Sequence, residues 1–244
     1  MEYRITPGRL EIGKFSLYYE RVGAGAPIVF LHGLGGNHLS WWQQVPYFMR
    51  SFECITVDQR GFNQSPDPDG SFNSAHPSDL AALLDHLKIE KAVLVGQSMG
   101  GWTIVGYALE HPDRVAAMVM ADTPGGIFTP DMKFERPREP LPVDASPPIG
   151  SLPTYAADYF AGHPEMAFLY DELRIHGARP PADAGARIIG MRYDLDKVKQ
   201  RLTMPILCLV GEEDVLIRPD IVKALAATLP NSRFRSVPGS GHSV

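Results

Sequence analysis

The chain has 244 residues, of which 44% are hydrophobic and 21% are charged, and its formal net charge at pH 7 is −5. A chain of this length and composition fits one globular α/β domain and excludes a disordered protein. The small negative charge excludes a strongly basic surface for nucleic acid or anionic lipid, so we expect no nucleic-acid partner.

Strand and helix patterns alternate along the chain. Leucines at helical spacing predict a helix over residues 78–87, and a second predicted helix over residues 101–109 ends before His111-Pro112. Runs that are apolar on both faces belong in a parallel sheet covered by helices, so the order of elements predicts a doubly wound α/β sheet. The predicted strands are residues 15–21, 27–31, 52–57, 92–95, 115–120 and 206–210.

One long segment interrupts this alternation. Residues 124–153 are rich in proline and carry no strand pattern, and two helical patterns over 154–176 and 182–200 follow before the sheet pattern resumes. An excursion that returns to the same sheet is an insertion, and long insertions tend to be lids or binding elements. A solvent-exposed decoration is the alternative. The predicted division is a core of residues 1–122 and 200–244 and a cap of residues 123–199.

A G-x-S-x-G pentapeptide over residues 96–100 carries the strongest chemical signal. It directly follows the apolar run 91–95 and precedes the predicted helix 101–109. A turn this tight needs small residues on both sides of the serine, because a Cβ there would collide with neighbouring elements. The turn points the Ser98 hydroxyl out of the sheet, above a helix N-terminus that stabilises developing negative charge. The segment therefore predicts a serine nucleophile.

Several segments resemble the α/β-hydrolase superfamily and follow one another in that family's order. The resemblance covers nearly the whole chain. It implies an α/β-hydrolase fold, with a mostly parallel central sheet, flanking helices and an inserted helical cap. The matching segments are the oxyanion-hole loop at 32–36, a D-x-R-G-x-G-x-S-like loop at 58–65 with Asn63 in place of its second glycine, Ser98 at the elbow, the acid loop at 211–214 and Gly241-His242.

The resemblance also implies a catalytic triad. A serine hydroxyl becomes an effective nucleophile when a base takes its proton, and His242 is the expected base for Ser98. A carboxylate must orient that histidine and stabilise it as a cation. Asp214 is the expected acid, with Glu212 and Glu213 as its rivals.

Backbone and loop residues complete this expected site. The N–H groups of Leu34 and Met99 are, by resemblance, the two donors to the oxyanion. We expect His32 to brace its loop by hydrogen bonds. Gln97 stands where relatives often have histidine, so we expect it to change the hydrogen bonding behind the elbow.

The substrate pocket is less clearly patterned. His38 and Trp42 follow the oxyanion loop and are candidate substrate contacts, with packing in the core or lid as the alternative. Aromatic residues of the cap favour an apolar pocket lining equally with a role in holding the cap helices together. The candidate contacts in the cap are Tyr155, Phe160 and Phe168.

The expected activity is the hydrolysis of a small carboxylic ester or lactone through an acyl-enzyme on Ser98. The same triad would serve a carbon–carbon bond hydrolase, an enol-lactonase of aromatic degradation or a short-chain perhydrolase. A receptor-like relative that turns over slowly is the alternative from another class. The eight histidines show no metal-ligand spacing, so we expect no metal and no other cofactor. The oligomeric state stays open.

Two further features concern the compartment and the chain end. No apolar run approaches the roughly 18 residues of a membrane span, and residues 1–4 do not begin a signal peptide, so we expect a cytoplasmic protein. Cys54 and Cys208 lie in apolar runs, which favours buried thiols over a disulfide. Only Ser243 and Val244 follow His242, whereas the family pattern continues into a helix. We therefore expect the natural chain to extend further.

Overall fold

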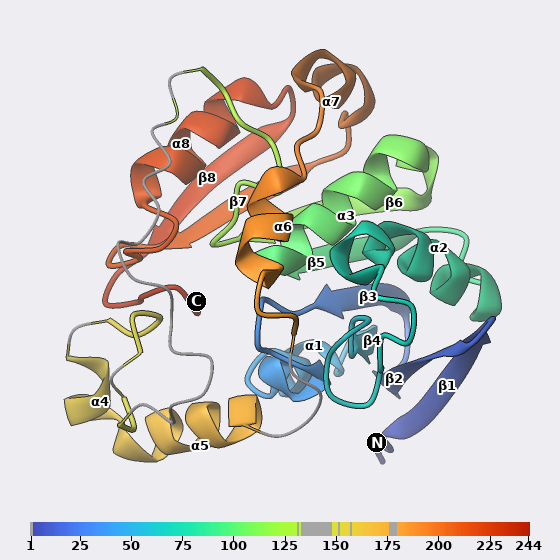
Figure 1. Cartoon of the computed structure of the whole chain (residues 1–244), viewed down its shortest axis with the longest axis horizontal. Helices are drawn as coiled ribbons and strands as arrows, with labels where there is room; N and C mark the ends of the chain where they lie inside the picture. Colours follow the sequence, from blue (N-terminus) through green and yellow to red (C-terminus); the bar gives the residue numbers. More distant parts are fainter. Residues whose placement is uncertain (1, 131, 133–147, 151, 157, 176–179) are drawn as a thin grey trace.

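The computed structural model describes residues 2–130, 132, 148–150, 152–156, 158–175 and 180–244 (Figure 1). In this part of the chain the strands form one eight-stranded sheet in the order β1-β2-β4-β3-β5-β6-β7-β8. Strand β2 runs antiparallel to β1 and β4, and every other neighbouring pair is parallel. The strands are β1 Thr6–Ile12, β2 Phe15–Gly23, β3 Ala26–Leu31, β4 Phe52–Val57, β5 Ala92–Gln97, β6 Val115–Ala121, β7 Ile206–Gly211 and β8 Ser232–Val237.

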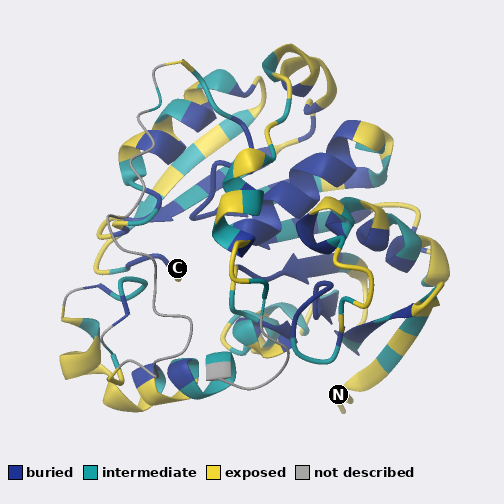
Figure 2. Ribbon diagram, in the orientation of Figure 1, coloured by how far each residue is buried: buried dark blue, intermediate teal, exposed yellow. Residues whose placement is uncertain are grey.

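Strand β3 shows why the central strands are apolar throughout. Val29 and Leu31 belong to the main core cluster, whereas Ile28 and Phe30 belong to a second cluster. Since successive side chains of a strand point to opposite faces, both faces of β3 are buried. Figure 2 shows this pattern as the dark blue strands in the middle of the sheet. The predicted parallel sheet, covered on both faces, is confirmed.

Helices cover the two faces of the sheet unequally. Apolar side chains of α2, α3, α7 and α8 all join the main core cluster, whereas η1 and α1 pack on the other face with Phe30. The helices are α1 Val45–Phe48, α2 His76–His86, α3 Met99–Glu110, α4 Tyr159–Gly162, α5 Pro164–Ile175, α6 Ala184–Gly190, α7 Leu195–Arg201 and α8 Pro219–Thr228, with 3-10 turns η1 His38–Trp41, η2 Phe72–Ser74 and η3 Pro112–Arg114.

The predicted cap range 123–199 is described only in part. Its residues 131, 133–147, 151, 157 and 176–179, which include most of the proline-rich stretch, lie outside the described residues. The two long helices predicted there are shorter pieces: α4 and α5 are separated at His163, just before Pro164, and α6 ends at Gly190. Helix α7 packs against α3 and buries Val198 in the main core.

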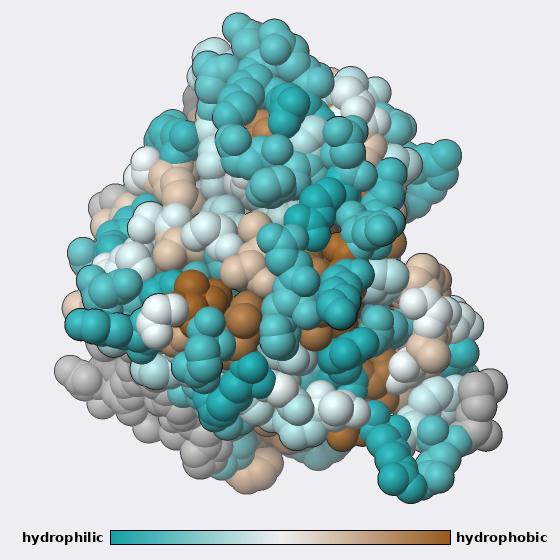
Figure 3. All heavy atoms as spheres, turned by 90° about the vertical axis from the view of Figure 1, so that its right-hand side faces the viewer, coloured by the Kyte–Doolittle hydropathy of each residue, from teal (hydrophilic) through white to brown (hydrophobic). Residues whose placement is uncertain are grey.

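The surface and the cysteines agree with a globular chain. The face shown in Figure 3 is mainly hydrophilic, with apolar atoms in small separate patches. Cys54 and Cys208 are buried and not in a disulfide, as the sequence predicts. Among the described residues, no helix is both long enough and apolar enough to cross a membrane.

Candidate active site

Ser98 lies at the sharp turn between β5 and α3. Its φ of 47° is in a region that non-glycine residues rarely adopt, so the turn holds the backbone under strain. A Cβ at Gly96 would lie 2.5 Å from the Gly100 carbonyl oxygen, and one at Gly100 would collide with the Leu31 carbonyl. The Ser98 amide donates to the Ala121 carbonyl at 2.9 Å. The two glycines and this bond to β6 fix the predicted elbow.

Ser98 and the predicted base and acid lie in one hydrogen-bonded row. The distance from Ser98 Oγ to His242 Nε2 is 2.9 Å, and from His242 Nδ1 to Asp214 Oδ2 it is 2.8 Å. Since an ionised carboxylate only accepts, Nδ1 carries the proton and Nε2 is left to accept from the serine hydroxyl. Such a row can move a proton from the serine oxygen to the histidine.

The sheet brings these three residues together. Ser98 directly follows β5, Asp214 lies three residues after β7, and His242 lies five residues after β8. Because β5, β7 and β8 run parallel, their carboxyl ends meet at one edge, where open α/β sheets bind their ligands. Ser98 and His242, whose side chains are hydrogen-bonded, are 144 positions apart in the sequence.

Asp214 is further distinguished from its two rivals by burial. Asp214 is 3% exposed, and its Oδ1 accepts hydrogen bonds from the amides of Leu216 and Ile217 at 2.8 and 2.9 Å. Glu212 and Glu213 are both exposed, and Glu212 accepts a hydrogen bond from a serine hydroxyl on β8. The geometry therefore brings only Asp214, of these three acids, to His242 Nδ1.

Gln97 holds the histidine loop. Its Nε2 donates to the His242 carbonyl at 2.7 Å, while the His242 amide donates to the Thr154 carbonyl at 2.8 Å. The loop is thus bound on one side by the residue before Ser98 and on the other by Thr154. The sequence analysis identifies Gln97 as a replacement for the histidine that relatives often have behind the elbow. No sequence pattern indicates that its partner is the His242 carbonyl, 145 positions away.

The predicted oxyanion loop lies against Ser98. A Cβ built on Gly33 would be 3.1 Å from the Ser98 Cβ and would collide with Gln97. His32 Nδ1 donates to the Gly33 carbonyl at 2.8 Å, and its Nε2 accepts from the Gln59 amide at 3.0 Å. Complete burial lowers the pKa of His32 to about 4, so the ring is neutral near pH 7. His32 braces its loop as the sequence predicts.

The two expected oxyanion donors occupy different local structures. Met99 is the first residue of α3, where backbone N–H groups have no partner within the helix. Leu34 lies in the loop after β3, and its side chain is 41% exposed. Their positions are compatible with two N–H groups near one carbonyl oxygen, and their role stays a prediction.

A small cavity opens beside this loop and is roofed by α5. It encloses about 60 Å³. None of the five predicted substrate contacts is among the described residues that line it. The lining residues are His32, Gly33, Leu34, Gly36, Ser40, Trp41, Gln44, Gln97, Tyr170, Leu173, Arg174, Ser243 and Val244.

His38 is buried behind the oxyanion loop. Its Nδ1 and its backbone amide lie 2.8 and 2.7 Å from Asp58 Oδ1, and its Nε2 lies 3.5 Å from Glu20. These contacts orient His38 toward the loop that begins at Asp58. Trp42 is half-buried, whereas its neighbour Trp41 packs on Phe30 in the core.

Of the three aromatic residues predicted to contact substrate within residues 123–199, Tyr155 contacts its own neighbours in that range. The Tyr155 hydroxyl donates to the Ala167 carbonyl at 2.9 Å, and its ring stacks on Tyr159 at 5.7 Å. Phe160 and Phe168 are 41% and 52% exposed. These contacts match the alternative in which the residues hold the cap helices together, and their contact with substrate stays a prediction.

Asp122 is a buried acid that the sequence analysis missed. It follows β6, and its two oxygens accept from the amides of Gly211 and Val244 at 3.0 and 3.2 Å. Burial is the main cause that raises its pKa to about 7, and the Asp214 charge adds to it while His242 opposes it. The sequence feature that could have identified Asp122 is an aspartate directly after a buried strand.

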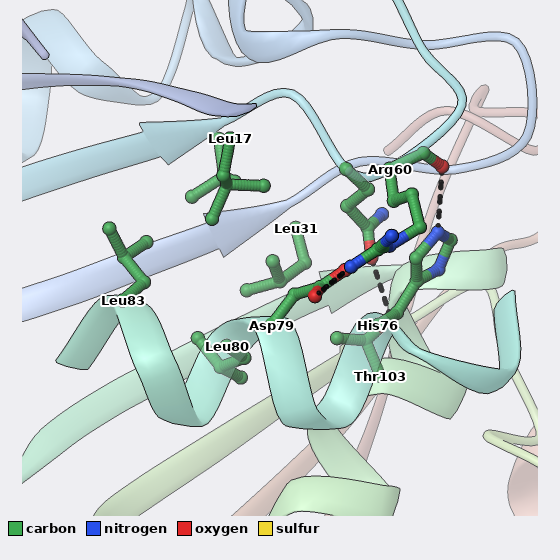
Figure 4. A pocket seen from close by; sticks show the side chains of 10 residues that line it. Leu17, Leu31, Arg60, His76, Asp79, Leu80, Leu83 and Thr103 are labelled. Atoms are coloured by element: carbon green, nitrogen blue, oxygen red, sulfur yellow. Dashed lines mark hydrogen bonds and ion pairs between the residues drawn. The ribbon is translucent and has the colours of Figure 1, made fainter. Parts of the chain in front are cut away.

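A second, smaller cavity of about 10 Å³ lies under the loop that follows β4 (Figure 4). Arg60 and Asp79 face each other across it through two hydrogen bonds of 2.7 and 2.8 Å. His76 Nε2 donates to the Arg60 carbonyl, and burial lowers the pKa of His76 to about 3. The paired charges and satisfied polar groups indicate a support for the loop.

Within the residues that the structure describes, no group of three or more His, Cys, Asp or Glu side chains could hold a metal ion.

Comparison with known proteins gives one consistent family. The family described as alpha/beta hydrolase fold matches residues 26–244. A candidate carbamate hydrolase, RutD of Caulobacter vibrioides, is 30% identical over 96% of this chain and 91% of its own, and a candidate non-heme bromoperoxidase, BpoC of Mycobacterium tuberculosis, is 27% identical over 93% and 90%. A thermophilic esterase from Thermogutta terrifontis superposes with a TM-score of 0.77 at 28% identity, over 98% of this chain and 92% of that one.

Proposed function

Because the chain belongs to the alpha/beta hydrolase fold family, we propose that it is a serine hydrolase that cleaves small carboxylic esters or lactones through an acyl-enzyme on Ser98. The observation that carries the proposal is the row of atoms from Ser98 Oγ through His242 to Asp214, with separations of 2.9 and 2.8 Å. The likeness to a thermophilic esterase supports the ester as substrate class.

In the first half of the proposed reaction, Ser98 Oγ attacks the substrate carbonyl carbon as its proton moves to His242 Nε2. Asp214 stabilises the resulting imidazolium through the Nδ1–H bond. The carbonyl oxygen becomes an oxyanion, which accepts hydrogen bonds from the Leu34 and Met99 amides. The C–O bond then breaks, and His242 gives its proton to the leaving alcohol.

In the second half, water takes the place of the alcohol. It attacks the acyl carbonyl carbon while one of its protons moves to His242 Nε2. Collapse of the tetrahedral intermediate breaks the bond to Ser98, which regains a proton from His242, and the acid leaves. No step in this sequence requires a redox reagent, because a hydroxyl and a proton are added across the ester bond.

The cap completes the proposed pocket. We assign residues 123–199 to it, and its helix α5 supports the assignment because Tyr170 and Leu173 line the cavity beside the oxyanion loop. The aromatic rings of Tyr155, Phe160 and Phe168, together with His38 and Trp42, remain proposed contacts for larger substrates.

Hydrolysis of a p-nitrophenyl ester series, from acetate to dodecanoate, tests the proposal. The wild type should hydrolyse at least the short esters, and Ser98→Ala should abolish that activity while the fold is retained by circular dichroism. Folded wild-type protein that hydrolyses none of the esters would contradict the ester proposal. Slow or absent labelling by a fluorophosphonate would then favour a receptor-like role.

Carbamate hydrolysis is a second candidate. The specific observation in its favour is the 30% identical relative named as a carbamate hydrolase, which aligns with 96% of this chain. The same serine attack on a carbamate carbonyl, followed by attack of water, would split the carbamate into an amine or ammonia, carbon dioxide and, for a carbamate ester, the alcohol. A p-nitrophenyl carbamate measured beside the matched ester separates the two: a higher kcat/KM for the carbamate would favour the second candidate.

A further inference from the structure

The cavity beside the oxyanion loop has one charged wall. Helix α5 places Arg174 in its lining, whereas the described lining residues include no Asp or Glu side chain. Among the other described lining residues, His32 alone has a titratable cationic side chain, and it is neutral near pH 7 because burial lowers its pKa to about 4. Arg174 therefore carries the charged side chain among the described lining residues.

Arg174 lies directly over the oxyanion loop. Its Nε is 3.8 Å, and its Nη2 4.0 Å, from the position that a Cβ on Gly35 would take. Gly33, two residues earlier in the same loop, is the residue whose Cβ would lie 3.1 Å from Ser98. Ser98 and Arg174 thus lie close to one short loop, at positions two residues apart.

Helix α5 is held in this place from two sides. The Asn37 side chain donates to the Leu173 carbonyl at 2.6 Å, which ties α5 to the loop after the oxyanion segment. The Tyr170 hydroxyl lies 2.9 Å from the Ser243 hydroxyl, next to His242. Arg174 is therefore positioned by contacts to both loops that frame Ser98.

Asp171, three residues before Arg174 on the helix, pairs with it only at long range. Asp171 Oδ1 lies 3.8 Å from the Arg174 guanidinium, beyond hydrogen-bond distance, and Asp171 Oδ2 accepts from the Gly150 amide at 3.0 Å. The Arg174 side chain is 28% exposed, so its planar fork of donors is accessible to a ligand. A fork of this shape matches the two oxygens of a carboxylate.

Two further polar groups in the cavity wall have unused hydrogen-bonding capacity. Among the described residues, Trp41 Nε1 and Gln44 Oε1 are buried side-chain atoms without a hydrogen-bond partner. Both atoms are shielded from the interior of the cavity, so an occupant of the cavity would not bond to them directly.

We propose that Arg174 is a substrate-binding residue that selects esters or lactones carrying a carboxylate a few bonds from the scissile carbonyl. This assignment rests on the proposed serine hydrolase function, because Ser98 supplies the reaction. Arg174 takes no part in bond breaking. It lowers KM, or raises kcat/KM, for anionic substrates relative to neutral ones of equal shape.

The test compares substrates that differ only in charge. Monoethyl adipate and ethyl adipamate carry the charge difference on the acyl side, and 4-acetoxybutanoate and 4-acetoxybutanamide carry it on the alcohol side. The wild type should prefer the carboxylate in at least one pair by about 10-fold to 100-fold in kcat/KM. Arg174→Gln should remove the preference by lowering kcat/KM for the carboxylate far more than for the amide, and Arg174→Lys should retain part of it.

Arg50→Gln is the matched control, because Arg50 is exposed and lies outside the cavity lining. It should leave the preference unchanged. Equal kcat/KM values for carboxylate and amide in both pairs would overturn the proposal. So would a preference that survives in Arg174→Gln, or an equal fall of both rates in that variant.

A binding measurement separates this proposal from the proposed function. In a Ser98→Ala background, calorimetry should show tighter binding of monoethyl adipate than of ethyl adipamate, and adding Arg174→Gln should abolish the difference. If the wild type hydrolyses neither these substrates nor the p-nitrophenyl esters, the hydrolase proposal fails whatever the calorimetry shows. If it hydrolyses both equally and the Ser98→Ala protein binds both equally, only the role of Arg174 fails.

Discussion

The site at the strand ends and the roof formed by α5 are built in different ways. Asp214 and His242 are 3% and 6% exposed, and they follow parallel strands whose ladders fix their spacing. Helix α5 instead exposes Phe168 to 52% and is tied to the core loops by hydrogen bonds from single side chains. A mutation in the first region should therefore change the reaction, and one in the second should change the choice of substrate.

Of the substitutions that test this difference, Asp214→Asn should have the largest effect on kcat. An amide cannot hold the His242 tautomer in which Nε2 accepts the serine proton, so kcat should fall by about 10⁴-fold. Glu213→Gln is the control, since Glu213 is exposed on the same loop, and its kcat should stay within about twofold of the wild type. A comparable loss in both variants, measured with p-nitrophenyl acetate, would contradict the assignment of the acid.

Gly100→Ala tests how tightly the elbow is packed. The added Cβ would collide with the Leu31 carbonyl. Because Leu31 is the last residue of β3, its backbone cannot move aside without disturbing that strand. The free energy of unfolding should therefore fall by about 2 to 4 kcal/mol. In α6, a Cβ on Gly185 would meet nothing within 4 Å. Gly185→Ala should therefore raise stability by about 0.5 to 1 kcal/mol. Urea unfolding curves that move in the same direction for both would break the distinction between elbow and cap.

Protonation of His32 should weaken the core at low pH. Its pKa is about 4 when folded and 6.5 in the reference state, so the unfolded chain binds more protons between these values and stability falls as the pH drops through this window. This contribution is on the order of 2 kcal/mol between pH 7 and pH 4.5. His32→Gln should show a shallower loss of stability in urea unfolding at the two pH values; an unchanged pH dependence would contradict it.

Tyr170→Phe should have the smallest effect, and it should change the binding of substrate beside α5 and not the reaction. The variant loses the hydroxyl that lies 2.9 Å from Ser243, so KM for short esters should rise about twofold to fivefold while kcat and the unfolding midpoint stay nearly constant. Tyr47→Phe, at a tyrosine that is 69% exposed, should change neither constant. A drop in kcat larger than the change in KM would place Tyr170 with the reaction instead.

The elbow was predictable because its determinants are local. Gly96 and Gly100 are required by close backbone approaches within one turn, and the strand and helix on either side have clear periodicities. The six strands expected from apolar runs are all present. The choice of Asp214 came instead from the resemblance to the α/β-hydrolase superfamily, whose pattern places the acid three residues after the glycine that ends β7.

Other parts depended on contacts that no local pattern reports. Strands β1 and β8 lie at the sheet edges and alternate between exposed and half-buried residues, so their patterns were not recognised. Gln97 meets His242 across 145 positions, and Asn37 meets Leu173 across 136. Such side-chain pairs are set by how the cap and the loops fold onto the sheet.

Mass spectrometry of the intact protein after reaction with a fluorophosphonate tests the central claim most directly. The wild type should gain one adduct per chain, and peptide mapping should locate it on Ser98. Ser98→Ala should gain none, and His242→Ala should react far more slowly, because Ser98 loses the base 2.9 Å from its hydroxyl. Equal labelling of the wild type and Ser98→Ala, or an adduct on another residue, would contradict Ser98 as the nucleophile.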